Sequence, residues 1–352
     1  MSAANPNKAV ADAIVGNYIA LLGADEVYAN IIEFLTANYI SARSDRARRF
    51  DPAACPWMVD PLLAAGSGRY RICSIVGCTG ASKSEMLTQF LIWAIKQSPG
   101  DTLFVIQSDA DAADYMCARF HTTVKAIECM KSVLPANQDS IRKSAVEFPH
   151  MNLWAGGANL NNLQSKSCKY VLADECWLWS PGMLSQAQAR THNRKDSCLI
   201  IAGQAGCQFD EHWHIMNRCH QHQWSFTCAQ CSHVIPYDYK LLTYETIRTG
   251  DNQLDCAAIT DSVRLVCPHC RTQYVEGDRH VLTGSYLAVP SNALPENIGF
   301  NIPALGVPHI PWSSLVIAKE EARDRMRVGD DSEMKSFKQK SEPRWMRVGQ
   351  WR

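Results

Sequence analysis

The sequence has none of the features that would place it outside the globular proteins. No apolar run approaches the roughly 20 residues that a membrane-spanning helix needs. The amino terminus, MSAANPNKAV, is polar and lacks the apolar core of a secretory leader. Neither an internal repeat nor a low-complexity tract is visible, which argues against solenoid and fibrous architectures. We therefore expect a cytoplasmic protein without membrane contact.

An excess of either charge is also missing. Lys plus Arg number 35 and Asp plus Glu number 35, which excludes a generally basic nucleic-acid coat but leaves room for a local basic channel. The chain has 352 residues, of which 46% are hydrophobic and 20% charged, so it is not a disordered chain. This length suggests two or three structural units with a sizeable core.

Cysteine, by contrast, is abundant, with 15 in the chain. In a reducing cytoplasm, paired cysteines indicate a metal site before a disulfide.

Short apolar runs alternate with helix-like periodicity through the first 225 residues. The runs that indicate buried strands are 70–76, 103–107, 170–173 and 198–202. Apolar residues at helical spacing mark 86–95, and 109–126 is also helix-like. Such alternation predicts an α/β fold, with a parallel sheet and flanking helical crossovers.

The segment GCTGASKS is the strongest local motif. It fits the phosphate-loop pattern G-x-x-x-x-G-K-[ST] except that Ser82 stands where the last glycine belongs. An apolar strand precedes it and an amphipathic helix follows, so backbone N–H groups and the helix dipole would cradle a phosphate. The predicted ATP-binding residues are Gly77, Cys78, Thr79, Gly80, Ala81, Ser82, Lys83 and Ser84.

Two residues of this loop have specific roles in a P-loop enzyme. Lys83 would reach the β- and γ-phosphates, and the Ser84 hydroxyl would bind Mg²⁺. The alternative is a polar strand-to-helix turn without a ligand, and Ser82 keeps it open because a side chain can crowd the loop.

The apolar run 170–173 ends in two carboxylates, Asp174 and Glu175. Acids at the carboxyl end of a parallel strand lie where such sheets bind ligands. We assign Asp174 to magnesium and Glu175 to activation of the attacking water. The alternative is that the pair only caps the next helix.

Two further polar residues belong to the prediction. Gln204 follows the run 198–202 and could sense the γ-phosphate, although a plain strand exit fits equally well. Arg190 lies between the runs 170–173 and 198–202 and is our candidate for a catalytic arginine. A surface salt bridge is its alternative.

Two C-x-x-C pairs stand in turn-like sequence, Cys228 with Cys231 and Cys267 with Cys270. Two such knuckles make a tetrahedral Cys₄ zinc site, which is closed and therefore structural. Residues 232–266 separate the pairs, more than the roughly 15–20 residues of compact sites, which an inserted loop would explain. The alternative is four free buried thiols; Cys256 is a weaker spare candidate.

These motifs divide the chain into four parts. A helical stretch over 8–40 and a basic linker, which includes Arg43, Arg46, Arg48 and Arg49, form the segment 1–50. We expect the ATPase core over 51–225 and a β-rich zinc-ribbon insertion over 226–285. A final segment, 286–352, contains a helix over 313–327 and ends in a linker.

Taken in order, these pieces resemble the lambda-type large terminase subunit, the GpA family, over residues 50–350. The resemblance is carried by CPWM, CTGASKSE, VIQSDADAA, WAGGANLNNLQSKSCKYVLADECW, TCAQC, VCPHC, IGFNIPALGVPHIPWSSLV and FKQKSEPRW. The serial order, with a zinc module after the acidic strand, is more specific than any single motif.

This resemblance implies a P-loop fold of the RecA/ASCE type and an ATP-driven motor of viral double-stranded DNA packaging. ATP, Mg²⁺ and Zn²⁺ would be its cofactors. Double-stranded DNA, a portal protein and a small terminase subunit would be its partners, in the host cytoplasm during virion assembly. The active form would be a homo-oligomeric ring.

The sequence departs from the family at Ser82 and at AGQ, residues 202–204, where a Ser-Thr-Pro-like segment is usual. The chain also stops where the family's nuclease domain would start. We therefore expect no DNA cleavage by this chain alone, with a separate nuclease subunit as one arrangement.

Two other readings remain open. A helicase-like DNA-remodelling ATPase would need a second motor lobe, for which the residues after Glu175 look too few. A zinc-ribbon module that binds DNA or a scaffold, carried on a degenerate ATPase, is the other.

Overall fold

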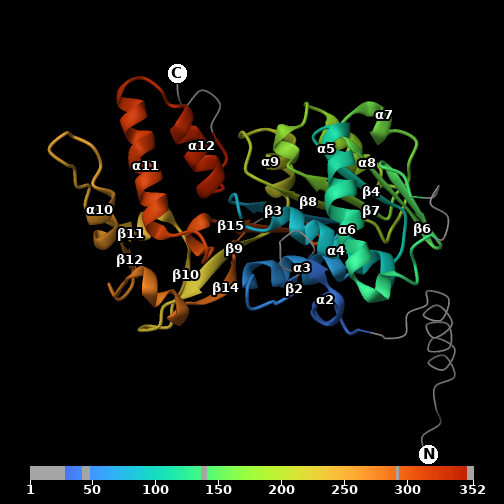
Figure 1. Ribbon diagram of the computed structural model, residues 1–352, viewed down its shortest axis with the longest axis horizontal. Coiled ribbons are helices and arrows are strands. Elements are labelled where there is room, and N and C mark those ends of the chain that lie inside the picture. Colours follow the sequence, from blue (N-terminus) through green and yellow to red (C-terminus); the bar gives the residue numbers. More distant parts are fainter. Residues whose placement is uncertain (1–27, 42–47, 136–140, 291–292, 347–352) are drawn as a thin grey trace, which may run out of the picture.

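The computed structural model describes residues 28–41, 48–135, 141–290 and 293–346. A ten-stranded mixed sheet runs through the molecule, with helices on both faces (Figure 1). The predicted α/β class is confirmed, and the large central sheet is parallel-rich but also contains antiparallel strands. No helix among the described residues has the length and apolar character to cross a membrane.

The centre of the sheet is parallel, and β3, β7 and β8 within it are buried along their whole length. Its order is β9 (His220–Thr227), β15 (Asn297–Ile302), β3 (Ile72–Gly77), β8 (Cys198–Gly203), β7 (Tyr170–Asp174), β4 (Thr102–Ile106) and β6 (Met151–Gly157). Antiparallel strands at the two ends are β5 (Ala145–Phe148), β10 (Val234–Pro236) and β14 (Thr283–Ala288). The runs predicted as strands thus lie side by side, and their carboxyl ends share one edge.

Burial on both faces explains why these strands read as continuous apolar runs. Along β3, Cys73 and Ile75 pack in a different cluster from Ile72, because successive side chains point to opposite faces. One face is covered by α3 (Val59–Gly66), α4 (Lys83–Gln97) and α6 (His121–Ala126). The other is covered by α7 (Leu160–Leu163), α8 (Met183–Ala189) and α9 (Glu211–Met216).

The predicted helix 109–126 has a wide turn in its middle. It consists of α5 (Asp109–Asp114), the π-helical segment η2 (Tyr115–Phe120) and α6. The side chain of Ser108 accepts a hydrogen bond from the Asp111 N–H and caps the start. The bounds agree with the sequence pattern, which gave no indication of the π-helical turn.

Only the end of the predicted amino-terminal helical stretch lies within the described residues. Of the predicted stretch 8–40, residues 8–27 lie outside the described part of the chain, and α2 spans Ile31–Asn38. Two short strands follow, β1 (Ile40–Ser41) and β2 (Arg48–Arg49), paired antiparallel. Arg48 and Arg49 are thus part of a hairpin; Arg43 and Arg46 lie outside the described residues.

The segment 226–285 contributes to two sheets. Its first and last strands belong to the central sheet, while β11 (Leu242–Thr243), β12 (Arg264–Val266) and β13 (Gln273–Tyr274) form a separate sheet. Helix α10 (Cys256–Ser262) precedes β12. Figure 1 shows this small sheet beside α11 (Trp312–Arg327) and α12 (Ser332–Ser341), at the opposite end of the molecule from α5 and α8. The helix predicted over 313–327 is confirmed.

Short 3₁₀ helices join several of these elements. They are η1 (Pro56–Met58), η3 (Glu128–Met130), η5 (Cys176–Leu178), η6 (Tyr239–Leu241), η7 (Glu276–Val281) and η8 (Ala304–Gly306).

Candidate nucleotide site and cysteine cluster

The predicted phosphate loop joins the carboxyl end of β3 to the first turn of α4. Lys83 is the first residue of α4; it is 5% exposed, and its Nζ donates a hydrogen bond to the Cys78 carbonyl at 2.8 Å. The ammonium group is therefore folded back over the loop. Because α4 is 15 residues long, its amino terminus contributes a dipole at the same place.

Ser82 occupies the position where the motif has glycine, and the backbone shows why. Its φ is 62°, in the left-handed region, and Gly80 has a φ of 84°. A side chain in this region costs about 1–2 kcal/mol, which glycine avoids. The turn is nonetheless formed, with the Ser82 hydroxyl facing the Cys55 sulfur at 4.0 Å.

Contacts from distant segments hold the loop. The Trp57 indole donates to the Ala81 carbonyl at 3.1 Å, which links the CPWM segment to the loop. The Thr79 N–H donates to the Lys340 carbonyl of α12 at 2.8 Å. His309 Nε2 lies 3.0 Å from the Gly80 carbonyl. The loop is thus supported independently of any ligand.

The two acids lie at the carboxyl end of β7, which is separated from β3 by one strand, β8. Asp174 is 6% exposed, and its Oδ1 has no hydrogen-bond partner among the described residues. Burial raises the pKa of Asp174 to about 6, against the opposing effect of a hydrogen bond with Ser84. A buried carboxylate oxygen without a partner, next to a hydroxyl, is a donor set that fits Mg²⁺.

Glu175 is part of a network that links the acids to the loop. Its Oε1 lies 3.7 Å from Lys83 Nζ. Its Oε2 accepts hydrogen bonds from Trp177 Nε1 at 2.5 Å and from the Gln204 N–H at 3.2 Å. The Gln204 side chain in turn donates to the Thr79 hydroxyl at 3.3 Å. Gln204 therefore contacts both the acid and the phosphate loop.

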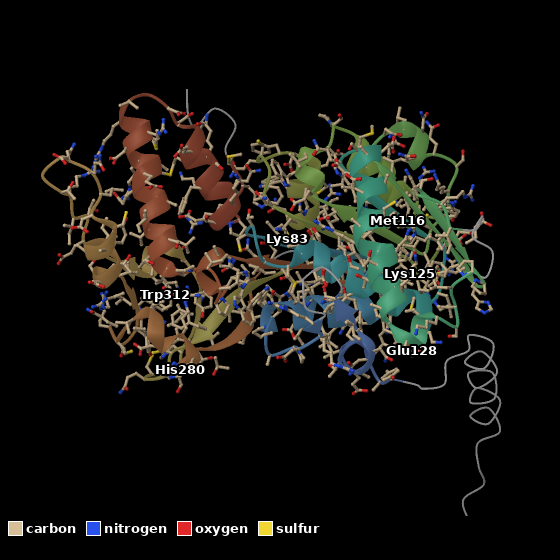
Figure 2. The ribbon with its side chains drawn as sticks, viewed as in Figure 1. Lys83, Met116, Lys125, Glu128, His280 and Trp312 are labelled. Atoms are coloured by element: carbon tan, nitrogen blue, oxygen red, sulfur yellow. The ribbon has the colours of Figure 1, made fainter. Side chains whose placement is uncertain are left out.

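A cavity of about 780 Å³, within the size range of small-molecule sites, lies beside the loop. Lys83, Ser84, Glu175 and Gln204 are among the residues that line it. Figure 2 shows Lys83 near the middle of the molecule, at the start of α4. The structure thus brings together the predicted lysine, serine, glutamate and glutamine.

The cavity also has residues that the sequence analysis did not assign to the site. The amino-terminal hairpin supplies Tyr39, Arg48, Arg49 and Phe50, and η2 supplies Arg119. The sequence pattern places Arg48 and Arg49 in a basic linker, not in the site. No local pattern marks these residues, because they reach the cavity only through tertiary packing.

Arg190 is not among the residues that the fold brings to this cavity. It follows α8, and its carbonyl accepts a hydrogen bond from the Cys168 N–H at 2.9 Å, near the start of β7. The acids lie at the other end of that strand, roughly 13 Å away at about 3.3 Å per residue. Its Nε donates to the Gln186 carbonyl at 3.3 Å. The catalytic role predicted for Arg190 in its own chain is therefore not supported.

The two C-x-x-C turns come together in space. Cys228 Sγ lies 3.6 Å from Cys270 Sγ, and Cys231 Sγ lies 3.7 Å from Cys267 Sγ. All four sulfur atoms lie within 4.8 Å of one another. A tetrahedral Zn²⁺ with Zn–S bonds of about 2.3 Å places its sulfur atoms roughly 3.8 Å apart, so the arrangement fits zinc.

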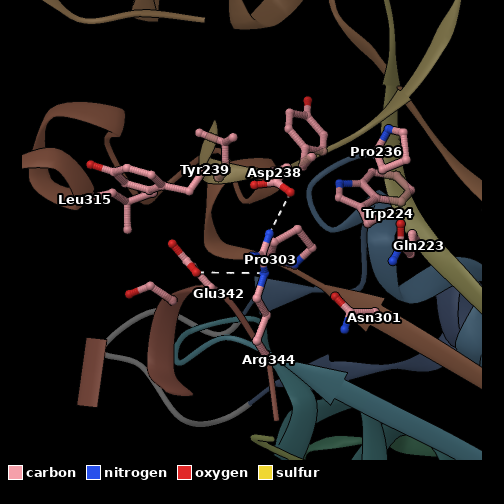
Figure 3. Close-up of a pocket in the computed structure, with 13 residues that line it drawn as sticks. Gln223, Trp224, Pro236, Asp238, Tyr239, Asn301, Pro303, Leu315, Glu342 and Arg344 are labelled. Carbon is pink, nitrogen blue, oxygen red and sulfur yellow. Dashed lines mark hydrogen bonds and ion pairs between the residues drawn. The ribbon is translucent and has the colours of Figure 1, made fainter. Parts of the chain in front are cut away.

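A smaller cavity, of about 110 Å³, lies between the central sheet and the carboxyl-terminal helices (Figure 3). Arg344 lines it and forms ion pairs with Asp238 at 2.6 Å and with Glu342 at 3.8 Å. Glu342 also lies 3.6 Å from Lys319. Since its charges pair with one another, this cavity is best explained as packing that anchors the segment after α12.

Comparisons with solved structures give two phage proteins. The large terminase ATPase domain of Thermus phage P74-26 aligns with a TM-score of 0.45 and 11% identity, over 81% of this chain and 92% of that chain. The large terminase of bacteriophage HK97 aligns with a TM-score of 0.40 and 13% identity, over 49% of this chain and 36% of that chain. No curated protein matches the sequence.

A family model gives the assignment. The model described as "Phage terminase large subunit gpA, ATPase domain" matches residues 44–285, which is more than half of the chain. The matched range begins between the two strands of the hairpin that lines the cavity and ends after the fourth cysteine of the cluster. The chain therefore belongs to the GpA ATPase-domain family of phage terminase large subunits.

Proposed function

We propose that this chain is the ATP-hydrolysing motor of viral double-stranded DNA packaging. The observation that carries the proposal is the convergence of Lys83, Ser84, Glu175 and Gln204 on one cavity at the carboxyl edge of the sheet. Membership of the terminase ATPase family supports the coupling of this hydrolysis to DNA.

The proposed division of roles follows from the geometry. Lys83 and the loop N–H groups would bind the phosphates, and Ser84 with Asp174 would hold Mg²⁺. The bound ion would neutralise charge on the β- and γ-phosphate oxygens. The Lys83 ammonium now contacts the Cys78 carbonyl and Glu175, so a phosphate that attracts it would release Glu175. Glu175 could then accept a proton from the attacking water.

Gln204 could couple nucleotide binding to movement of the loop after β8. It bonds to Glu175 through its backbone and to Thr79 through its side chain. A shift of Glu175 on nucleotide binding would therefore also displace Gln204, at the start of the loop after β8. We propose that this residue senses the γ-phosphate.

The remaining parts of the proposal concern metal, partners and organisation. Cys228, Cys231, Cys267 and Cys270 would bind one structural zinc ion in a ribbon-like insertion over 226–285. Residues 1–50, 51–225 and 286–352 would be the amino-terminal segment, the ATPase core and the carboxyl-terminal segment. A portal protein, a small terminase subunit and a homo-oligomeric ring in the host cytoplasm are proposed from the family. That this chain alone does not cleave DNA stays a prediction.

The test is ATP turnover and nucleotide affinity of the purified chain, with and without linear duplex DNA. We expect DNA-stimulated turnover, falling steeply as salt rises because DNA binding releases counterions. Lys83→Ala should weaken ATP binding at least 100-fold, because it removes the charge that faces the phosphates. Lys125→Ala is the matched control, since Lys125 is exposed on α6. Unchanged ATP affinity in Lys83→Ala would contradict the proposal.

A further inference from the structure

Arg119 lines the nucleotide cavity together with Lys83, Ser84 and Glu175, yet no motif includes it. Its side chain is half-buried on the π-helical segment η2. Within the described ranges, its guanidinium group has neither an ion-pair nor a hydrogen-bond partner. A cation that faces a phosphate-binding loop without a partner is available for a ligand anion.

The position of Arg119 is fixed through Tyr115, one turn earlier. The Tyr115 ring stacks on Phe104 of β4, with centroids 4.2 Å apart and planes 9° apart. Its hydroxyl lies 3.0 Å from the Thr88 hydroxyl of α4, which lies 3.1 Å from the Ser84 carbonyl. This chain of contacts ties η2 to the turn that carries the proposed magnesium ligand Ser84.

The π-helical turn changes which residues face the cavity. Tyr115, Met116 and Phe120 are buried in the core, whereas Arg119 remains open to the cavity. Figure 2 shows Met116 and Lys125 along one continuous helical segment, to the right of Lys83. Wide turns of this kind interrupt the regular ladder and occur frequently at functional sites.

Arg119 is less exposed than the other two arginines that line the cavity. Arg48 and Arg49 line the cavity from the hairpin, and both are exposed. Among the three arginines of the cavity, Arg119 is thus the one whose helical segment is tied to Ser84, through Tyr115 and Thr88.

We propose that Arg119 is a catalytic arginine that acts within its own chain; this inference rests on the proposed function. Its guanidinium would contact the γ-phosphate oxygens and stabilise the charge that develops on them. The bond between the γ-phosphorus and the bridging oxygen breaks, and its electron pair stays with ADP. The attacking water forms the new phosphorus–oxygen bond, and Glu175 accepts the proton that this water loses.

The test compares Arg119→Ala and Arg119→Lys with Arg190→Ala as the matched control. Arg119→Ala should lower kcat about 10³-fold, the lower end for a catalytic arginine. Affinity for a non-hydrolysable ATP analogue should stay within a few-fold, while affinity for ADP with aluminium fluoride should fall with kcat. Arg119→Lys should recover little, because an ammonium cannot make two parallel hydrogen bonds to a phosphate. Arg190→Ala should behave as the parent protein.

Several outcomes would overturn the assignment. Absence of turnover in the parent protein would refute the proposed function itself. Parental turnover that Arg119→Ala retains would refute the role of Arg119 alone. Loss of aluminium fluoride binding in Arg48→Ala or Arg49→Ala, but not in Arg119→Ala, would transfer the role to the hairpin. Thermal melting checks that each variant is folded.

Mixing two inactive variants tests whether Arg119 acts within its own chain. Arg119→Ala keeps Glu175, and Glu175→Gln keeps Arg119. If Arg119 acts in its own chain, no subunit of a mixture has both groups at one site, and turnover should stay at the level of the separate variants. Recovered turnover in the mixture would show that Arg119 serves a neighbouring subunit and would overturn the proposal.

Discussion

The nucleotide cavity and the cysteine cluster differ in how their polar groups are satisfied. In the cavity, Lys83 is bonded to the Cys78 carbonyl and paired with Glu175, so the site is held together by its own groups. In the cluster, the four thiols face one another at 3.6 and 3.7 Å across the two turns. The first region can therefore fold before its ligand arrives and rearrange when it binds. The second has the geometry of a site whose metal is part of its folding energy.

The largest effect that this contrast predicts concerns Glu175. Glu175→Gln should keep ATP bound and lower turnover by about 10³-fold, because the amide cannot accept the proton of the attacking water. Single-turnover hydrolysis and equilibrium ATP binding measure the two quantities separately. Glu128→Gln is the control, since Glu128 is exposed on η3. Near-parental turnover in Glu175→Gln would mean that the base lies elsewhere.

Removal of zinc should affect the cysteine cluster and not the nucleotide cavity. Purified protein should contain about one zinc ion per chain, and Cys270→Ser should lower this content. Cys256→Ser is the control, because Cys256 is exposed and outside the cluster. Chelation should increase amide exchange in β11–β13 while ATP affinity changes little. If chelation weakened amide protection in β11–β13 and ATP affinity to the same extent, the two regions would form one cooperative unit. An ordered cluster without metal would contradict the zinc site.

A smaller effect should come from acid, which acts on the central sheet through His212. Its Nε2 lies 2.9 Å from the Ser74 hydroxyl of β3, and its Nδ1 has no partner among the described residues. Burial lowers the pKa of His212 from 6.5 to about 3. As the pH falls, the unfolded chain binds this proton below about pH 6.5, whereas the folded chain binds it only near pH 3. The free energy of unfolding should therefore fall by about 1.4 kcal/mol per pH unit between pH 6 and 4.

Replacement of His212 isolates this contribution. His212→Gln should flatten the dependence of the unfolding free energy on pH in that range, measured by denaturant titration. His214→Gln, exposed on the same helix, should keep the parental slope. Because neither variant alters the thiols, acid release of zinc affects all proteins alike. Identical slopes in all three would show that His212 is protonated in the folded protein.

The sequence alone was sufficient wherever the chemistry is local. The phosphate loop needs eight consecutive residues between a strand and a helix, and each cysteine turn needs four. Buried strands read as apolar runs because both of their faces are covered, so the α/β class was predictable. Ser82 was recognised as a departure, and its positive φ gives the physical reason.

Only the tertiary structure decided which distant residues share the cavity. Strand order places β8 between β3 and β7, which brings Gln204 to both Thr79 and Glu175. The same order leaves Arg190 at the opposite end of the strands and brings Arg119 into the cavity. It also divides the strands of 226–285 between two sheets. Strand pairing joins residues far apart in the chain, so no local pattern of apolar or charged residues can specify these neighbours.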